Sequence, residues 1–75
     1  MELKLKFCKE VEKPTSLQIF QDGEKSFSCN DISYRGNITK FVKTLPVGIR
    51  FDIAEIVDRL EGVDCPFQAE FTLRG

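Results

Sequence analysis

Four carboxylate residues recur at every third position within one short stretch of the chain: Asp52, Glu55, Asp58 and Glu61. Carboxylates act as general acids or bases near neutral pH only where their surroundings raise a pKa. The spacing places all four on the solvated side of a predicted helix, where the pKa values have little reason to move. Such a row of negative charge can instead engage a basic site on a partner. We predict a protein-binding surface here, the alternative being a face that only keeps the protein in solution.

The other reactive side chains lack the partners that catalysis or metal binding needs. The chain has three cysteines, Cys8, Cys29 and Cys65, and no histidine. A cysteine nucleophile would have no imidazole to activate it, and a zinc site of the Cys/His type would lack its fourth ligand. The sequence contains no P-loop, no dinucleotide-binding glycine motif and no serine-hydrolase elbow. We therefore expect a protein that is not an enzyme and holds no metal or cofactor.

The composition is typical of a cytoplasmic protein. An odd number of widely spaced cysteines argues against a disulfide framework. The first 15 residues alternate charged with apolar side chains, unlike a signal peptide, and no apolar run is long enough to cross a bilayer. Eleven Lys and Arg residues against twelve Asp and Glu residues leave a net charge of −1. Any binding must therefore depend on local patches, because there is no strong global field.

The alternative function is nucleic-acid binding, because the middle third of the chain is basic. The residues that would carry it form a basic segment with one aromatic side chain: Tyr34, Arg35, Lys40 and Lys43. The following helix would then occupy the place of a recognition helix, but phosphates would repel its carboxylates. The uneven distribution of charge has a simpler interpretation: the basic middle third and the acidic last third lie side by side and partly neutralise each other across solvent.

The element expected to position the four carboxylates is a helix over residues 52–61. Asp52 is placed to cap its first amides, and Glu55 can reach back to the cap. Phe51 and Ile56 stand at the two positions of a hydrophobic staple. The apolar side is formed by residues that follow helical spacing, namely Ile53, Ile56, Val57 and Leu60.

Two further signals delimit the helical region. Gly62 stands where a left-handed C-terminal residue is expected. A preceding helix over residues 37–45 is predicted from its apolar spacing, with Asn37 as its cap and Pro46 ending it. Its β-branched residues leave a third strand of a hairpin as an alternative for this segment.

Four segments have the pattern of strands. Residues 1–7 and 67–74 alternate apolar with polar side chains, which indicates strands that are dry on one face. Residues 16–20 and 24–29 flank a Gln-Asp-Gly turn. We predict a three-residue loop with a glycine bulge, because that register brings the apolar residues of both strands to one side.

The predicted order β-β-β-α-α-β gives a single α+β domain over residues 1–75. It is a two-layer sandwich, with two helices on one face of a four-stranded, mostly antiparallel sheet. The inward side chains should be Leu3, Leu5, Phe7, Leu17, Ile19, Phe27, Ile38, Phe41, Val42, Leu45, Phe51, Ile53, Ile56, Val57, Leu60, Phe67, Phe71 and Leu73.

An unpaired sheet edge, such as that of the 16–29 hairpin, offers a second route to partners, including a homodimer. No stretch resembles a known family closely enough to transfer residue roles. The size and the lack of enzyme motifs fit a small regulatory protein, such as an accessory protein or a phage-encoded modulator of a host factor. We predict a protein partner, with nucleic acid as the alternative and no membrane association.

Overall fold

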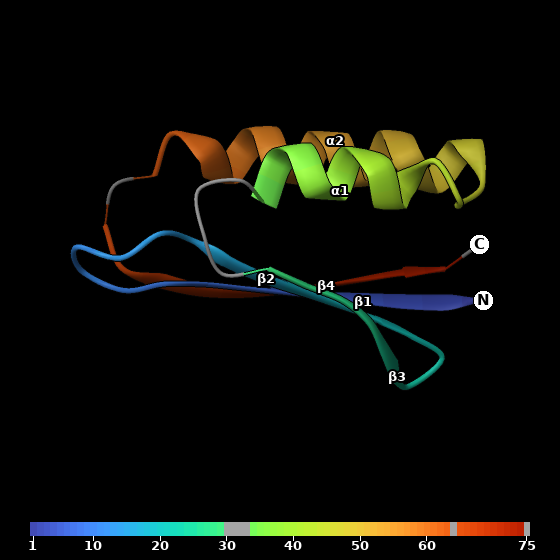
Figure 1. Ribbon diagram of the computed structural model, residues 1–75, viewed down its shortest axis with the longest axis horizontal. Coiled ribbons are helices and arrows are strands. Elements are labelled where there is room, and N and C mark those ends of the chain that lie inside the picture. The colour runs from blue at the N-terminus through green and yellow to red at the C-terminus, as the bar shows by residue number, and fades with distance from the viewer. Residues whose placement is uncertain (30–33, 64, 75) are drawn as a thin grey trace.

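Two helices lie side by side over one face of a four-stranded antiparallel sheet in the computed structural model (Figure 1). The structure describes residues 1–29, 34–63 and 65–74, and the side chains of Tyr34, Arg35 and Glu61 lie outside this description. The elements are β1 (Glu2–Lys9), β2 (Ser16–Gln21), β3 (Glu24–Cys29), α1 (Tyr34–Val42), α2 (Val47–Glu61) and β4 (Phe67–Arg74). The predicted α+β fold and element order are confirmed, and the segment that could have been helix or strand is helical.

The sheet order is β3-β2-β1-β4, so the first and last strands of the chain are neighbours. Leu3 lies opposite Leu73, and Lys9 lies opposite Phe67. β1 and β4 pair over all eight residues of each strand. The two segments with alternating side chains are therefore strands with one buried face, as predicted. β1 lies in the interior of the sheet, and β3 and β4 form its edges.

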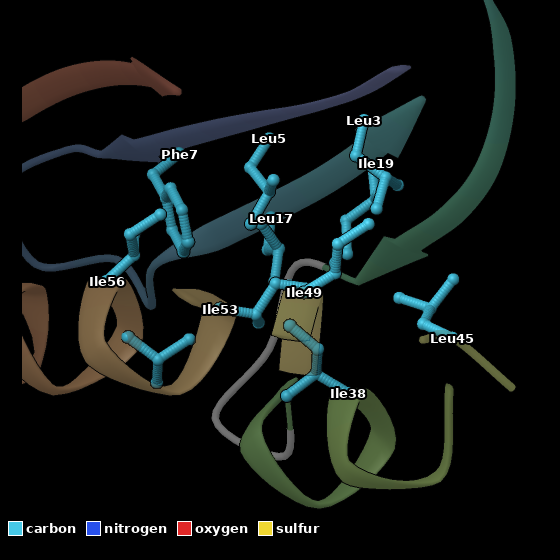
Figure 2. Packing of buried hydrophobic residues seen from close by; sticks show 11 residues of the cluster. Leu3, Leu5, Phe7, Leu17, Ile19, Ile38, Leu45, Ile49, Ile53 and Ile56 are labelled. Carbon is cyan, nitrogen blue, oxygen red and sulfur yellow. The ribbon is translucent and has the colours of Figure 1, made fainter. Parts of the chain in front are cut away.

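The core lies between the sheet and the helices, as Figure 2 shows. Its buried apolar side chains are Leu3, Leu5, Phe7, Leu17, Ile19, Ile38, Leu45, Ile49, Ile53, Ile56 and Val57. Two ring pairs extend it toward the sheet edges. Phe7 meets Phe71 edge to face at 6.1 Å between ring centres, and Phe27 meets Phe41 at 5.5 Å. Every member of the predicted inward set is buried or half-buried except Phe51, which is exposed, and Ile49 was missing from the set.

The predicted start of the second helix is wrong, because α2 begins at Val47. Pro46 precedes it in an extended conformation, and no side chain caps the first amides. The helical pattern starts with the Arg50 amide, which donates to the Pro46 carbonyl at 3.1 Å. Asp52 consequently lies inside the helix and is not its cap. Burial of Ile49 is worth about 1.5–3 kcal/mol, whereas an Asp cap contributes about 1 kcal/mol, so the longer helix is favoured.

The longer helix also turns Phe51 to solvent. Phe51 lies two residues from both Ile49 and Ile53, which is a rotation of about 200° around a helix. Since the two isoleucines face the sheet, Phe51 faces away from it and is 68% exposed. The predicted hydrophobic staple between Phe51 and Ile56 is therefore wrong.

The connection between the helices also differs from its prediction. α1 begins at Tyr34, so Asn37 lies inside it, and it ends at Val42 rather than at Leu45. Leu45 is buried in the turn that follows. The side chain of Arg50, in the first turn of α2, donates to the carbonyl of Leu45 at 2.8 Å and to that of Lys43 at 3.0 Å. This guanidinium therefore holds the turn against the start of α2.

For the hairpin of β2 and β3, the predicted loop is wrong, but the predicted alignment of the apolar residues is correct. The loop has two residues, Asp22 and Gly23, whose φ angles are 48° and 89°, and Gln21 pairs with Glu24. Positive φ at both central residues is the geometry of the tightest hairpins. The register then shifts between Ile19 and Phe20, which makes Ser26 the extra residue of a bulge. The bulge therefore lies within β3, two residue pairs beyond the loop, and it still brings the apolar residues of both strands to one side.

Two glycines allow a test of the turn geometry. We expect Gly23→Ala to lower the free energy of unfolding by about 1–2 kcal/mol, because a Cβ disfavours the left-handed conformation and no neighbouring atom obstructs the new methyl group. The control is Gly62→Ala. Gly62 has φ −86°, not the left-handed angle predicted for it, and it also has open space around it. Chemical denaturation should show no loss for Gly62→Ala, and equal losses for both variants would contradict this description.

Candidate protein-binding surface

The side of α2 that faces away from the sheet combines exposed apolar residues with carboxylates. We name it the outer face of α2 and define it as Val47, Phe51, Glu55 and Asp58. Val47 and Phe51 are 59% and 68% exposed, and both carboxylate residues are also exposed. Steps of three and four residues place the members on neighbouring turns of one side. The apolar part lies toward the beginning of the helix and the acidic part follows it.

The predicted acidic residues are spaced so that each step of three falls about 60° short of a full turn. Asp52 therefore lies toward one flank of α2, away from Glu55 and Asp58. Asp52, Glu55 and Asp58 are all exposed. Glu61 ends α2, and its side chain lies outside the described residues. The helix thus brings Glu55 and Asp58 together beside Phe51, with Asp52 on one flank.

Phe51 and Val47 are the members that sequence reasoning missed. Phe51 was assigned to the core because the helix was expected to begin at Asp52. The overlooked signal is Ile49, which stands four residues before Ile53 and extends the apolar spacing by a turn. With that turn included, Val47 and Phe51 fall on the side opposite the core.

A shallow hollow separates the outer face from α1. Its volume is about 130 Å³, and its floor is apolar, formed by Ile38, Val42, Ile53, Ala54 and Val57. Thr39, Arg50 and Asp58 supply polar atoms around it. The hollow therefore adjoins the acidic part of the outer face through Asp58 and offers an apolar recess beside it.

The basic segment is only partly described. Lys40 is exposed on α1, and Lys43 is exposed in the turn after it. The side chains of Tyr34 and Arg35 lie outside the described residues. The nucleic-acid surface therefore stays a prediction.

Other reactive groups are dispersed. Cys8, Cys29 and Cys65 form no disulfide bond with one another. Within residues 1–29, 34–63 and 65–74, no three potential metal ligands gather, and neither helix is long and apolar enough to cross a membrane. In the loop after β1, the ammonium of Lys13 lies 2.7 Å from a carboxylate oxygen of Glu10. This hydrogen bond and charge lower the pKa of Glu10 and raise the pKa of Lys13, but both side chains are exposed and belong to the loop after β1, not to α2.

Comparison with known proteins adds no assignment, since no protein-family model, no curated protein and no solved structure matches the chain. A functional proposal must therefore stand on the surface itself.

Proposed function

We propose that this protein is a non-catalytic, cytoplasmic binding domain that recognises a protein partner through the outer face of α2. The observation that carries the proposal is the exposure of Phe51. A phenylalanine with 68% of its surface in solvent leaves unused the stabilisation that burial of such a side chain gives, about 1.5–3 kcal/mol. Val47 enlarges the same apolar area.

The composition of the face resembles the general composition of protein interfaces. A few buried aromatic anchors supply most of the binding energy in such contacts, and polar residues surround them. In this surface Phe51 would be the anchor residue, and Glu55 and Asp58 would belong to the polar rim. The hollow between the helices provides a recess for an apolar side chain of the partner.

The charges indicate the chemistry of the partner. Glu55 and Asp58 lie beside Phe51, so the matching surface should offer an apolar pocket bordered by Lys or Arg side chains. The same carboxylates disfavour a phosphate backbone at this site. We therefore expect the partner to be a protein with a basic binding site.

The proposal is tested by capturing partners from an extract of the native host and identifying them by mass spectrometry. We expect Phe51→Ala, and separately Glu55→Lys with Asp58→Lys, to abolish capture of the partner while changing the melting temperature little, because these side chains are exposed. The matched control is Glu12→Lys with Glu24→Lys, which reverses the same number of exposed carboxylates away from α2.

Capture that survives both outer-face variants would reject this surface. Loss of capture in the control as well would show that net charge, rather than the outer face, governs binding. The nucleic-acid alternative predicts a salt-sensitive gel shift with DNA or RNA probes that weakens with Lys40→Ala and Lys43→Ala. If no probe shifts at low salt, that alternative is removed.

A further inference from the structure

The two edges of the sheet differ in how well they are protected against pairing with another strand. β3 contains a bulge and begins with exposed charged residues, Glu24 and Lys25. Both features hinder edge-to-edge association. β4 is eight residues long, contains no proline and keeps an unbroken register with β1. Its charged residues, Glu70 and Arg74, already pair with Lys4 and Glu2 of β1. β4 is therefore the less protected of the two edges.

The direction of the free backbone groups at this edge follows from the contacts of Glu2. Its amide donates to the Asp22 carboxylate at 2.9 Å, and its carbonyl accepts from the Asp22 amide at 2.9 Å, so both groups point toward β2. Alternate residues of a strand point in opposite directions, so Leu3 and the odd-numbered residues after it bond β4. Their partners are the odd-numbered residues of β4. The amides and carbonyls of the even-numbered residues therefore face outward: Gln68, Glu70, Thr72 and Arg74.

We propose that two copies of this chain associate through their β4 strands, antiparallel and with the twofold axis at Phe71. The four outward-facing residues then exchange main-chain hydrogen bonds with the second copy. Gln68 lies opposite the second copy's Arg74, and Glu70 lies opposite its Thr72. The two sheets join into one, and the helices of both copies lie on the same side.

The register is selected by which residues can stand opposite each other. Residues on the same face must meet, so a symmetric antiparallel pair must be centred on a residue. A centre at Glu70 would place this carboxylate opposite its own copy, which is unfavourable. A centre at Thr72 would use only the last part of β4. The centre at Phe71 pairs residues 68–74 of both copies and sets no like charges directly opposite each other.

The apolar side of β4 also favours a second copy as the occupant. Phe67, Ala69, Phe71 and Leu73 all point toward the helix layer but stay half-buried, because β4 has no further strand beyond it among the described residues. In the proposed register, Phe71 meets the second copy's Phe71, and Ala69 meets its Leu73. Phe71 already contacts Phe7 edge to face, so the two cores become continuous across the axis.

Sedimentation equilibrium on the full chain tests the association. We expect a mass of twice 8.6 kDa at high concentration, with dissociation on dilution. Thr72→Pro removes an outward amide without touching the ladder to β1 and should leave only monomer. Ser28→Pro is the matched control at the other edge. Ser28 pairs with Gln18, whose main-chain groups point toward β1, so the Ser28 amide also faces outward, and this variant should still dimerise. A wild-type chain that stays monomeric from micromolar to millimolar concentration would overturn the proposal.

A second pair of variants tests the register without changing the backbone. Thr72→Glu sets a carboxylate opposite the second copy's Glu70 and should weaken the dimer roughly tenfold, because the contact occurs twice. Thr72→Lys sets an ammonium there and should strengthen the dimer by a similar factor. A centre at Thr72 would instead make both variants repulsive. Equal weakening by Glu and Lys would therefore reject the Phe71 register, and no effect of either would reject β4 as the interface.

Discussion

Ile53→Ala should lower the free energy of unfolding by about 2–5 kcal/mol, because it removes a fully buried side chain from the centre of the core. Ile53 is 2% exposed and belongs to the cluster between the helices and the sheet. The total stability of a chain of this length is about 4–11 kcal/mol, so the loss is a large fraction of it. Urea unfolding followed by circular dichroism measures the change.

The matched control is Phe51→Ala, two residues away on the same helix. The sequence pattern placed both side chains in the core, but only Ile53 is buried. Truncation of the exposed Phe51 should change stability by less than about 0.5 kcal/mol. Similar losses for both variants would mean that Phe51 packs inward after all, and the proposed binding surface would lose its anchor.

Asp52→Pro should cost about 3 kcal/mol or more, because Asp52 lies beyond the first turn of α2. At that place proline removes a main-chain hydrogen bond and its ring clashes with the preceding turn. Val47→Pro is the control. Val47 is the first residue of α2, and Pro46 before it is already extended, as the residue preceding a proline prefers to be. Thermal unfolding should show a large decrease for Asp52→Pro and a small change for Val47→Pro.

This pair also separates the two descriptions of the helix. If the helix began at Asp52, as its capping pattern indicates, proline at that position would be tolerated and proline at Val47 would lie outside the helix. A mild effect of Asp52→Pro would therefore favour the shorter helix that begins at Asp52, with Phe51 as the residue before it.

The sheet was predictable because its strands are governed by one simple rule. Residues 2–7 and 67–74 alternate strictly, and a one-residue slip would move every apolar side chain to the wet face. The same rule explains why the hairpin alignment was correct although its loop was not. Ile19 and Phe27 can lie opposite each other on the buried face only if the hairpin contains one extra residue. The alternation of the strands does not determine whether this residue lies in the turn or within β3.

The helix boundaries were harder to predict, because local signals competed with burial. Asp52, Glu55 and Gly62 form a convincing pattern of helix start and stop residues, yet the chain begins α2 at Val47. The deciding contribution is Ile49, whose burial needs the sheet beneath it. The hydrogen bonds from Arg50 to the turn carbonyls, likewise, depend on how the two helices meet. Neither contact is visible from the spacing of residues along one helix.

The proposed binding surface was only partly predictable, because its apolar residues depend on where α2 begins. The exposed carboxylates Glu55 and Asp58 follow from helical spacing alone, so they were predicted. Phe51 could not be placed correctly until the start of α2 was known. An aromatic residue is usually assigned to the interior of a small protein, because few such residues are left in solvent. The exception arises from a shift of the helix start by little more than one turn.

The pairing of β1 with β4 has a consequence for how the protein is made. Glu2 and Arg74 are 72 positions apart and yet adjacent in the sheet. During synthesis, β1 can pair with β2 early, but its other edge stays unpaired until β4 has been synthesised. Contacts between distant parts of a chain slow folding, and a nascent chain with an open strand invites intermolecular association. Completion of the sheet therefore waits for β4, and until then a chaperone would find the free edge of β1 accessible.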